Sequence, residues 1–302
     1  MMDNYYSETE KTLKNEISGL WNMKGVYCMK DLVCSPVVKW AGGKRQLLPV
    51  LKPMMPEFEK YFEPFFGGGA LYFDILPDSA VINDFNPQLV NVYKQIKKSP
   101  SKMCETIREI QDEYNGFETD EERTEFYYKL RDEFNEVIDE KSLRAAALLI
   151  FLNKAGFNGL YRVNSSGKYN VPPAHRKRIN AFDEDNIKAI SKALKGTRIM
   201  CGDFEKACKG AEEGDFVFFD SPYYDTFDTY QAGGFSESDH IRLFNLFKNL
   251  TEKGVKCMLT NNDCEFIKEL YSDYNIKVIE VKRMINCNGN KRTGREVVIT
   301  NY

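Results

Sequence analysis

The run Phe216-Val-Phe-Phe-Asp-Ser-Pro-Tyr223 places an acid and an aromatic ring directly after an apolar segment. An apolar strand would deliver Asp220 to the carboxyl end of a sheet, where open α/β folds bind their ligands. Pro222 stiffens the turn, because its ring fixes φ and removes a donor. The Asp220 carboxylate and the Ser221 carbonyl can accept the two hydrogens of an exocyclic amine on a base, and Tyr223 can stack on its ring. These residues predict an amine-activating site; the alternative is a buried aspartate that only caps a turn.

A glycine-rich turn is the second chemical feature. Glu63-Pro-Phe-Phe-Gly-Gly-Gly69 follows a strand signal, and glycines there let the backbone approach a ligand closely. The start of the next helix favours a carboxylate or a phosphate. Asp84 follows Gly67 by about 17 residues, where an α/β nucleotide site places the acid for its ribose hydroxyls. The pair predicts a nucleoside cofactor, although neither a Walker lysine pattern nor a complete G-x-G-x-x-G is present.

The elements that must position these residues follow from the apolar pattern. A short helix is predicted at Ala70–Leu76. Strands are predicted at Tyr61–Phe66, Ala80–Ile82, Asp215–Phe219, Val255–Thr260, Ile276–Val281 and Glu296–Asn301. Residues 87–152 have the apolar spacing of helices, and 153–178 are rich in Gly, Asn, Ser and Pro, as in a loop or hairpin. Strands alternating with helices at both ends predict a mostly parallel α/β sheet with a helical, basic insertion.

Composition limits the classes of function. The chain has 302 residues, including 21 Phe and 17 Tyr, enough for a large core or for a catalytic domain with a smaller one. No run approaches the roughly 18 apolar residues of a membrane helix, and the N-terminus has no secretory h-region. The eight cysteines form no C-x-x-C pair, and the only histidines are His175 and His240. We therefore expect no membrane contact, zinc site or disulfide framework, and a cytoplasmic location.

Basic residues are concentrated in two segments. Residues 141–182 and 281–295 contain no Asp or Glu but together carry thirteen Lys or Arg, while the whole chain has a net charge of −3. An acidic body with two basic segments indicates a polyanionic partner that is touched at defined places. The alternative is two solvated loops, and charge alone does not exclude it.

Six motifs then occur in a characteristic order and spacing. They are Lys39-Trp-Ala-Gly-Gly-Lys44, Phe62-Glu-Pro-Phe-Phe-Gly-Gly-Gly-Ala70, Ile82-Asn-Asp-Phe-Asn86, Asn158-Gly-Leu-Tyr-Arg-Val-Asn164, Asn170-Val-Pro172 and Asp220-Ser-Pro-Tyr223. The set resembles the Dam-type DNA adenine-N6 methyltransferases (alpha group, D12 class) from about residue 37 to the C-terminus. The resemblance implies a Rossmann-like, S-adenosylmethionine-dependent methyltransferase sheet with an inserted, mainly helical target-recognition domain. The implied divisions are a polar extension at 1–33, a catalytic domain at 34–95 and 190–302, and a recognition domain at 96–189 with a DNA-reading hairpin at 153–178.

The resemblance also implies roles for single residues. The catalytic set is Asp220, Ser221, Pro222 and Tyr223. The cofactor set is Trp40, Lys44, Phe65, Gly67, Gly69, Asp84 and Asp220. The DNA-binding set is Lys39, Asn158, Leu160, Arg162, Asn170, Pro172, His175 and Arg176. In that set Lys39 touches a guanine, Leu160 wedges into the duplex and Arg162 reads a base; no metal is implied.

The implied enzyme is a site-specific, adenine-specific DNA methyltransferase that flips its target out of a short duplex motif, commonly GATC. The chain contains no Pro-Cys dipeptide, which agrees because a cytosine-C5 enzyme would use that cysteine as its nucleophile. Two positions depart from the family pattern. Ser221 stands where a second proline is usual, and this change affects the expected rate of methylation. His175, next to Arg176, stands where a base-reading arginine is usual, and this change affects the expected target sequence.

Two other functions stay open. RNA and protein glutamine also present planar amines that suit an Asp-x-Pro-Tyr site, but the motifs at 158–164 and 170–172 favour duplex DNA. A catalytically silent DNA-binding relative is supported only by Ser221, and the intact Asp220 and Tyr223 oppose it. The partners we expect are double-stranded DNA and a cognate restriction endonuclease, with the protein a monomer or weak dimer.

Overall fold

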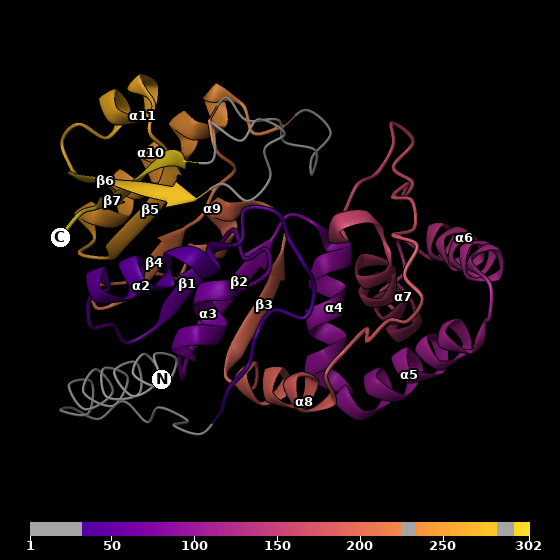
Figure 1. Ribbon diagram of the computed structural model, residues 1–302. Coiled ribbons are helices and arrows are strands. Elements are labelled where there is room, and N and C mark those ends of the chain that lie inside the picture. Colours follow the sequence, from indigo (N-terminus) through magenta and orange to yellow (C-terminus); the bar gives the residue numbers. More distant parts are fainter. Residues whose placement is uncertain (1–31, 225–233, 283–292) are drawn as a thin grey trace, which may run out of the picture. The chain divides into compact units, whose positions relative to one another are not determined.

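The computed structural model describes residues 32–224, 234–282 and 293–302. Every element below belongs to the unit Leu32–Tyr302 (Figure 1). Most of the extension expected at 1–33, and residues 283–292 of the second basic segment, lie outside the described residues. Within the described ranges, no helix is both long and apolar enough to span a bilayer.

A seven-stranded sheet forms the centre of the described part. Its strands are β1 (Tyr61–Glu63), β2 (Ala80–Asp84), β3 (Thr197–Cys201), β4 (Phe216–Phe219), β5 (Lys256–Asn262), β6 (Asn275–Lys282) and β7 (Thr293–Thr300). Their order is β3-β2-β1-β4-β5-β7-β6. Strands β1 to β5 pair in parallel, whereas β7 pairs antiparallel with both β5 and β6. The mostly parallel α/β sheet predicted from the sequence is thus confirmed.

Several strand ends differ from the sequence-based prediction, for example the start of β7 at Thr293 in place of Glu296, and two differences have a clear physical reason. Strand β1 ends at Glu63 and not at Phe66, because Pro64 has no N–H with which to continue the ladder. Strand β3 was not expected. It lies at the edge of the sheet and leaves Arg198 and Cys201 exposed, so it has no continuous apolar run by which a buried strand is recognised.

Different helices cover the two faces of the sheet (Figure 1). They are α2 (Leu48–Leu51), α3 (Ala70–Ile75), α4 (Pro87–Lys98), α5 (Pro100–Gly116), α6 (Asp120–Glu136), α7 (Leu143–Ala155), α8 (Glu184–Ala193), α9 (Phe204–Ala207), α10 (Glu237–Glu252) and α11 (Glu265–Leu270), with 3-10 turns η1 (Lys44–Leu47), η2 (Lys52–Met54) and η3 (Phe157–Gly159). In β4, Phe216 and Phe218 join the apolar cluster of α2–α8, whereas Val217 and Phe219 join that of α9–α11. This alternation follows from the two-residue period of a strand.

Helix α7 is the centre of a helical bundle. Its residues Ala145–Asn153 are all buried, and α4, α5 and α6 pack around it. A helix that is buried on every side needs no polar face. After α7 the chain forms a hairpin-like excursion over residues 156–173. The antiparallel bridges Gly156↔Pro173 and Val163↔Tyr169 join its two arms. The boundaries 96–189 for a separate recognition domain stay a prediction.

Candidate active site

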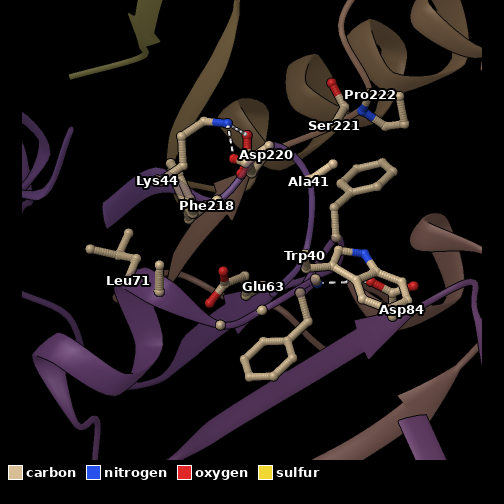
Figure 2. Close-up of a pocket in the computed structure, with 18 of the residues that line it drawn as sticks. Trp40, Ala41, Lys44, Glu63, Leu71, Asp84, Phe218, Asp220, Ser221 and Pro222 are labelled. Atoms are coloured by element: carbon tan, nitrogen blue, oxygen red, sulfur yellow. Dashed lines mark hydrogen bonds and ion pairs between the residues drawn. The ribbon is translucent and has the colours of Figure 1, made fainter. Parts of the chain in front are cut away.

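The carboxyl ends of three parallel strands bring acids together. Glu63 ends β1, Asp84 ends β2, and Asp220 follows β4. Each stands two positions after a residue of the α2–α8 apolar cluster, and side chains alternate along a strand, so all three lie on one side of the sheet. They line one cavity of about 290 Å³ (Figure 2). Open α/β sheets bind their ligands at this position.

Asp84 ties the glycine turn to the start of α4. The Gly67 N–H donates to Asp84 Oδ2 at 2.8 Å, and the Asn86 N–H donates to Oδ1 at 2.8 Å. Gly67 and Gly69 have φ values of +51° and +69°, and a Cβ on Gly69 would lie 2.3 Å from Phe66 Cζ. Only glycine fits such a left-handed, crowded turn. The turn therefore holds the Asp84 carboxylate in a fixed plane beside the cavity.

Aromatic rings form much of the cavity wall. Trp40 packs on Tyr161 with ring centroids 5.1 Å apart, and Figure 2 places Trp40 beside Asp84. Phe65 stacks on Phe204 at 5.2 Å. Phe85 also lines the cavity but is 58% exposed, which is unusual for a large apolar side chain. Flat apolar surfaces thus flank the acid that ends β2.

Glu63 is a cavity residue that the sequence reasoning did not single out. Its side chain is only 3% exposed, and its Oε2 accepts the Tyr61 hydroxyl at 2.9 Å. Burial raises the Glu63 pKa well above its usual range, and the nearby charges of Asp220 and Asp84 raise it further. Burial therefore favours the neutral form of the Glu63 carboxyl group. Its place before Pro64 in the glycine motif was visible in the sequence, but its burial was not.

Asp220 has two partners with hydrogens to donate. Lys44 Nζ lies 2.6 Å from Asp220 Oδ1, and the Thr260 hydroxyl donates to the same oxygen at 2.8 Å. Lys44 is 7% exposed; its Nζ also donates to the Gly42 carbonyl at 2.7 Å and lies 4.7 Å from the Tyr223 ring centroid. Figure 2 shows the lysine turned toward the aspartate. A nitrogen donor thus lies between a carboxylate and an aromatic ring.

The end of β5 braces the turn after Asp220. Ser221 is 2% exposed, and its Oγ accepts from Asn261 Nδ2 at 3.5 Å. The Tyr224 N–H donates to Asn261 Oδ1 at 3.0 Å, and Asn262 Nδ2 donates to the Tyr224 carbonyl at 2.6 Å. Pro222 follows Ser221 in the cavity lining. The serine that replaces a family proline is therefore accommodated by β5 side chains.

The structure brings all ten candidate catalytic and cofactor residues to this cavity. They are Trp40, Lys44, Phe65, Gly67, Gly69, Asp84, Asp220, Ser221, Pro222 and Tyr223. None of the eight DNA-binding candidates is among the lining residues. They lie in the segment before Trp40, in the excursion after α7 and, for His175 and Arg176, in the loop that follows it. In the described ranges, no three or more His, Cys, Asp or Glu side chains are grouped as metal ligands.

Asn153 joins two of the DNA-binding motifs. This fully buried side chain accepts from the Lys39 N–H at 2.8 Å and donates to the carbonyls of Lys39 at 3.0 Å and Gly159 at 2.8 Å. A Cβ on Gly159 would lie 2.5 Å from Lys39 Cδ. The two sequence-distant motifs therefore form one surface, and Asn153, which lies in an apolar helix, was missed by the sequence reasoning.

Leu160 and its neighbour Phe157 are placed differently from the expected wedge. Leu160 is half-buried against the main core, whereas Phe157 is 51% exposed. Asn158 between them is exposed and has a φ of +54°, which turns the chain sharply. The exposed large apolar side chain of this turn is therefore Phe157, which lies one residue before the motif at 158–164 that contains Leu160.

Arg162 is held by Asn170 across the two arms of the excursion. Arg162 Nε donates to Asn170 Oδ1 at 2.7 Å, and Nη2 donates to the Asn170 carbonyl at 3.1 Å. The Phe157 N–H donates to the Pro172 carbonyl at 2.9 Å, nearer the base of the excursion. Both Arg162 and Pro172 are exposed. The guanidinium therefore has a defined orientation on the surface.

His175 and Arg176 lie on an exposed loop. His175 has a φ of +50°, and its Nδ1 lies 2.8 Å from Asp120 Oδ2 at the start of α6. The Arg176 carbonyl accepts the Tyr114 hydroxyl at 2.8 Å, and its side chain is exposed. His175 thus contacts an acid of the same molecule.

Cations gather where α7 ends. Burial lowers the Lys154 pKa, and the positive charges of Lys39, Arg45 and Arg176 lower it further. Elsewhere in the first basic segment Arg144 pairs with Glu133 at 2.6 Å. Cations that lie close together repel one another, and a bound anion would reduce this repulsion. Arg144 already has Glu133 as its counter-charge and therefore attracts an anion less.

Comparisons with known proteins agree with this geometry. The fold is that of an α/β protein with a cavity at the carboxyl ends of its parallel strands. A model of the D12 class of N6 adenine-specific DNA methyltransferases matches residues 40–285. The chain is 42% identical to a type II methyltransferase, M1.LlaDCHI, of Lactococcus lactis subsp. cremoris (88% of this chain, 95% of that protein). It is 40% identical to M.MjaIII of Methanocaldococcus jannaschii (88% and 99%) and 28% identical to a DNA adenine methylase of Salmonella typhi (88% and 94%).

The chain therefore belongs to the D12 class of N6 adenine-specific DNA methyltransferases. This confirms the resemblance drawn from the six motifs. It makes the protein a DNA adenine methyltransferase whose substrate is DNA.

Proposed function

We propose that this enzyme transfers a methyl group from S-adenosylmethionine to N6 of an adenine turned out of double-stranded DNA. The observation that carries the proposal is the place of the Lys44 ammonium, 2.6 Å from Asp220 Oδ1 and 4.7 Å from the Tyr223 ring centroid. This spot accommodates a nitrogen donor between a carboxylate and a ring face. An adenine base would fit this spot, because its N6 amine can donate to the carboxylate while its flat ring stacks on the ring of Tyr223.

The other half of the cavity suits S-adenosylmethionine. Asp84, fixed by two backbone N–H groups, would accept the ribose hydroxyls, and the rings of Trp40 and Phe85 would hold the nucleobase. Burial raises the pKa of Glu63, and the ammonium of the methionine portion beside it would lower that pKa again, because an opposite charge favours the carboxylate. When bound, the cofactor supplies an electrophilic methyl group on a sulfonium.

The catalytic residues would prepare the amine. The Asp220 carboxylate and the Ser221 carbonyl accept its two hydrogens, which favours a pyramidal nitrogen and directs its lone pair. The incoming amine takes the place of the Lys44 ammonium at Asp220. Flipping costs a few kcal/mol, and stacking on Tyr223 returns about 1–3 kcal/mol. Methyl transfer leaves the N6 proton to be released, with Asp220 next to it as acceptor.

The exposed residues after α7 would read the duplex. Arg162 can donate two hydrogen bonds to guanine O6 and N7, about 1–3 kcal/mol of discrimination, and Lys39 and Arg176 can contact bases or phosphates. GATC is the target that the family resemblance implies. His175 stands in place of an arginine, so the target sequence has to be mapped. Two relatives named type II methyltransferases support a restriction-modification setting with a cognate endonuclease.

Methylation mapping tests the proposal. The wild-type chain and an Asp220→Ala variant are expressed in a host without its own adenine methylation, and plasmid DNA is sequenced by a long-read method that detects N6-methyladenine. We expect modification in one short motif with the wild type and none with the variant. Purified, folded protein that binds DNA and S-adenosylmethionine but modifies no adenine would refute the proposal and direct the assay to RNA and protein glutamine.

A further inference from the structure

The Tyr223 hydroxyl has a partner from the far end of the chain. It donates to Glu296 Oε2 at 2.7 Å, and Glu296 belongs to β7, the strand that runs antiparallel in the sheet. The Thr260 hydroxyl donates to Asp220 Oδ1 at 2.8 Å, and Thr260 also lies close enough to the Tyr223 side chain to influence its pKa. Thr260 is fully buried. Two hydrogen-bonded pairs, Asp220 with Thr260 and Tyr223 with Glu296, therefore lie next to each other at the cavity.

Strand register explains why these side chains meet. In the antiparallel pair β5–β7, Asn262 lies opposite Glu296 and Thr260 lies opposite Val298. Directly opposite residues point to the same face of a sheet, and Val298 belongs to the α2–α8 apolar cluster. Thr260 and Glu296 therefore share the face on which Asp220 lies. A shift of β7 by one residue would turn Glu296 to the other face.

Tyr223 stays a proton donor in this network. Burial raises its pKa well above the usual range, and the carboxylates of Asp220 and Glu296 raise it further. A neutral phenol bonded at its oxygen cannot swing about its χ bonds without losing that bond. The ring face beside Lys44 is thus oriented before any base arrives, and a site organised in advance loses less on binding.

We propose that Glu296 and Thr260 are positioning residues: Glu296 fixes the Tyr223 ring by accepting its hydroxyl, and Thr260 fixes the Asp220 carboxylate by donating to it. This role rests on the proposed function, because it concerns the stacking and hydrogen bonding of the flipped base. It gives the closing strand β7 a part in catalysis besides its part in the sheet.

A double-mutant cycle tests the role of Glu296. Tyr223→Phe, Glu296→Ala and the double variant are compared with the wild type in single-turnover methylation of a duplex. We expect each single change to lower the rate by about tenfold, and the double variant to be no slower than either, because both remove one hydrogen bond. The KM for DNA should change little. A 2-aminopurine at the target position should be brighter with Glu296→Ala than with the wild type, because a loosely held ring quenches it less.

Matched variants separate positioning from general damage. Glu280→Ala, on the exposed part of the neighbouring strand β6, should behave as the wild type. Thr260→Val should lower the rate, and Thr260→Ser, which keeps the hydroxyl, should restore most of it; this pair decides the question if Glu296→Ala does not fold. Wild-type activity in Glu296→Ala, or additive losses in the cycle, would overturn the positioning role. A wild type that methylates no adenine would instead refute the proposed function.

Discussion

Lys44 and Asp220 form a close ion pair in the cavity, with Nζ 2.6 Å from Oδ1, and their side chains are only 7% and 17% exposed. A charge so far removed from water needs a partner, and removing one member of such a pair leaves the other uncompensated. The lysine therefore supplies the counter-charge for the Asp220 carboxylate. In the function proposed above, the substrate amine takes the place of this ammonium beside Asp220.

Asp220→Ala should abolish methylation while DNA binding persists. Asp220 lies in the cavity, and the DNA-binding candidates lie elsewhere, so the change removes an amine acceptor and no phosphate contact. We expect the rate to fall by at least about a hundredfold, as for other preorganised polar groups in active sites. Transfer of labelled methyl groups and a gel-shift titration measure the two properties. Equal loss of binding would show that Asp220 has a different role.

Much of the sheet could be predicted because its strands are apolar runs that end in recognisable turns. Phe216–Phe219 is buried on both faces and stands out in any apolar profile. Strand β3 could not be found in this way, because Arg198 and Cys201 face solvent at the edge of the sheet. Local patterns report how a segment is buried, and an edge strand is buried on too little of its surface to leave such a pattern.

The cavity could be predicted in part. Its glycines, Asp84 and Asp220 are recognisable because chemistry restricts residue type at a turn and at a strand end. Glu63 and Glu296 were not singled out, because nothing in their neighbourhood along the chain shows that one is buried or that the other meets Tyr223. Such contacts depend on strand register, which appears only when the sheet is assembled.

Arg162→Ala should relax the sequence preference of the enzyme more than it lowers affinity. The guanidinium is exposed and held at two points by Asn170, which suits two-point recognition of a guanine. Asn170→Ala should act in the same direction but more weakly, since it frees the arginine without removing it. Binding is measured on duplexes that differ by one base pair. A uniform drop on all duplexes, with a reduced salt dependence, would identify Arg162 as a phosphate contact.

Phe157→Ala should impair base flipping more than Leu160→Ala does. Phe157 is 51% exposed, whereas Leu160 packs against the core, so only the phenylalanine can enter a duplex without rearrangement. Conversely, Leu160→Ala should cost more stability, about 1–3 kcal/mol for a partly buried side chain. Fluorescence of a 2-aminopurine target and urea unfolding measure the two effects. The opposite ranking in flipping would restore Leu160 as the wedge.

Glu63→Gln should change how stability depends on pH. The Glu63 pKa is raised from 4.5 by burial, so the folded protein holds a proton that the unfolded chain releases. The stability that this group contributes is fully present below about pH 4.5 and is lost as pH rises through the raised value, by up to about 1.4 kcal/mol per pH unit. A glutamine, neutral throughout, should flatten that decline, whereas Glu57→Gln on the exposed surface should not. Urea unfolding at about pH 5 and about pH 8 decides: identical pH slopes for Glu63→Gln and the wild type would mean that Glu63 is already ionised in the fold.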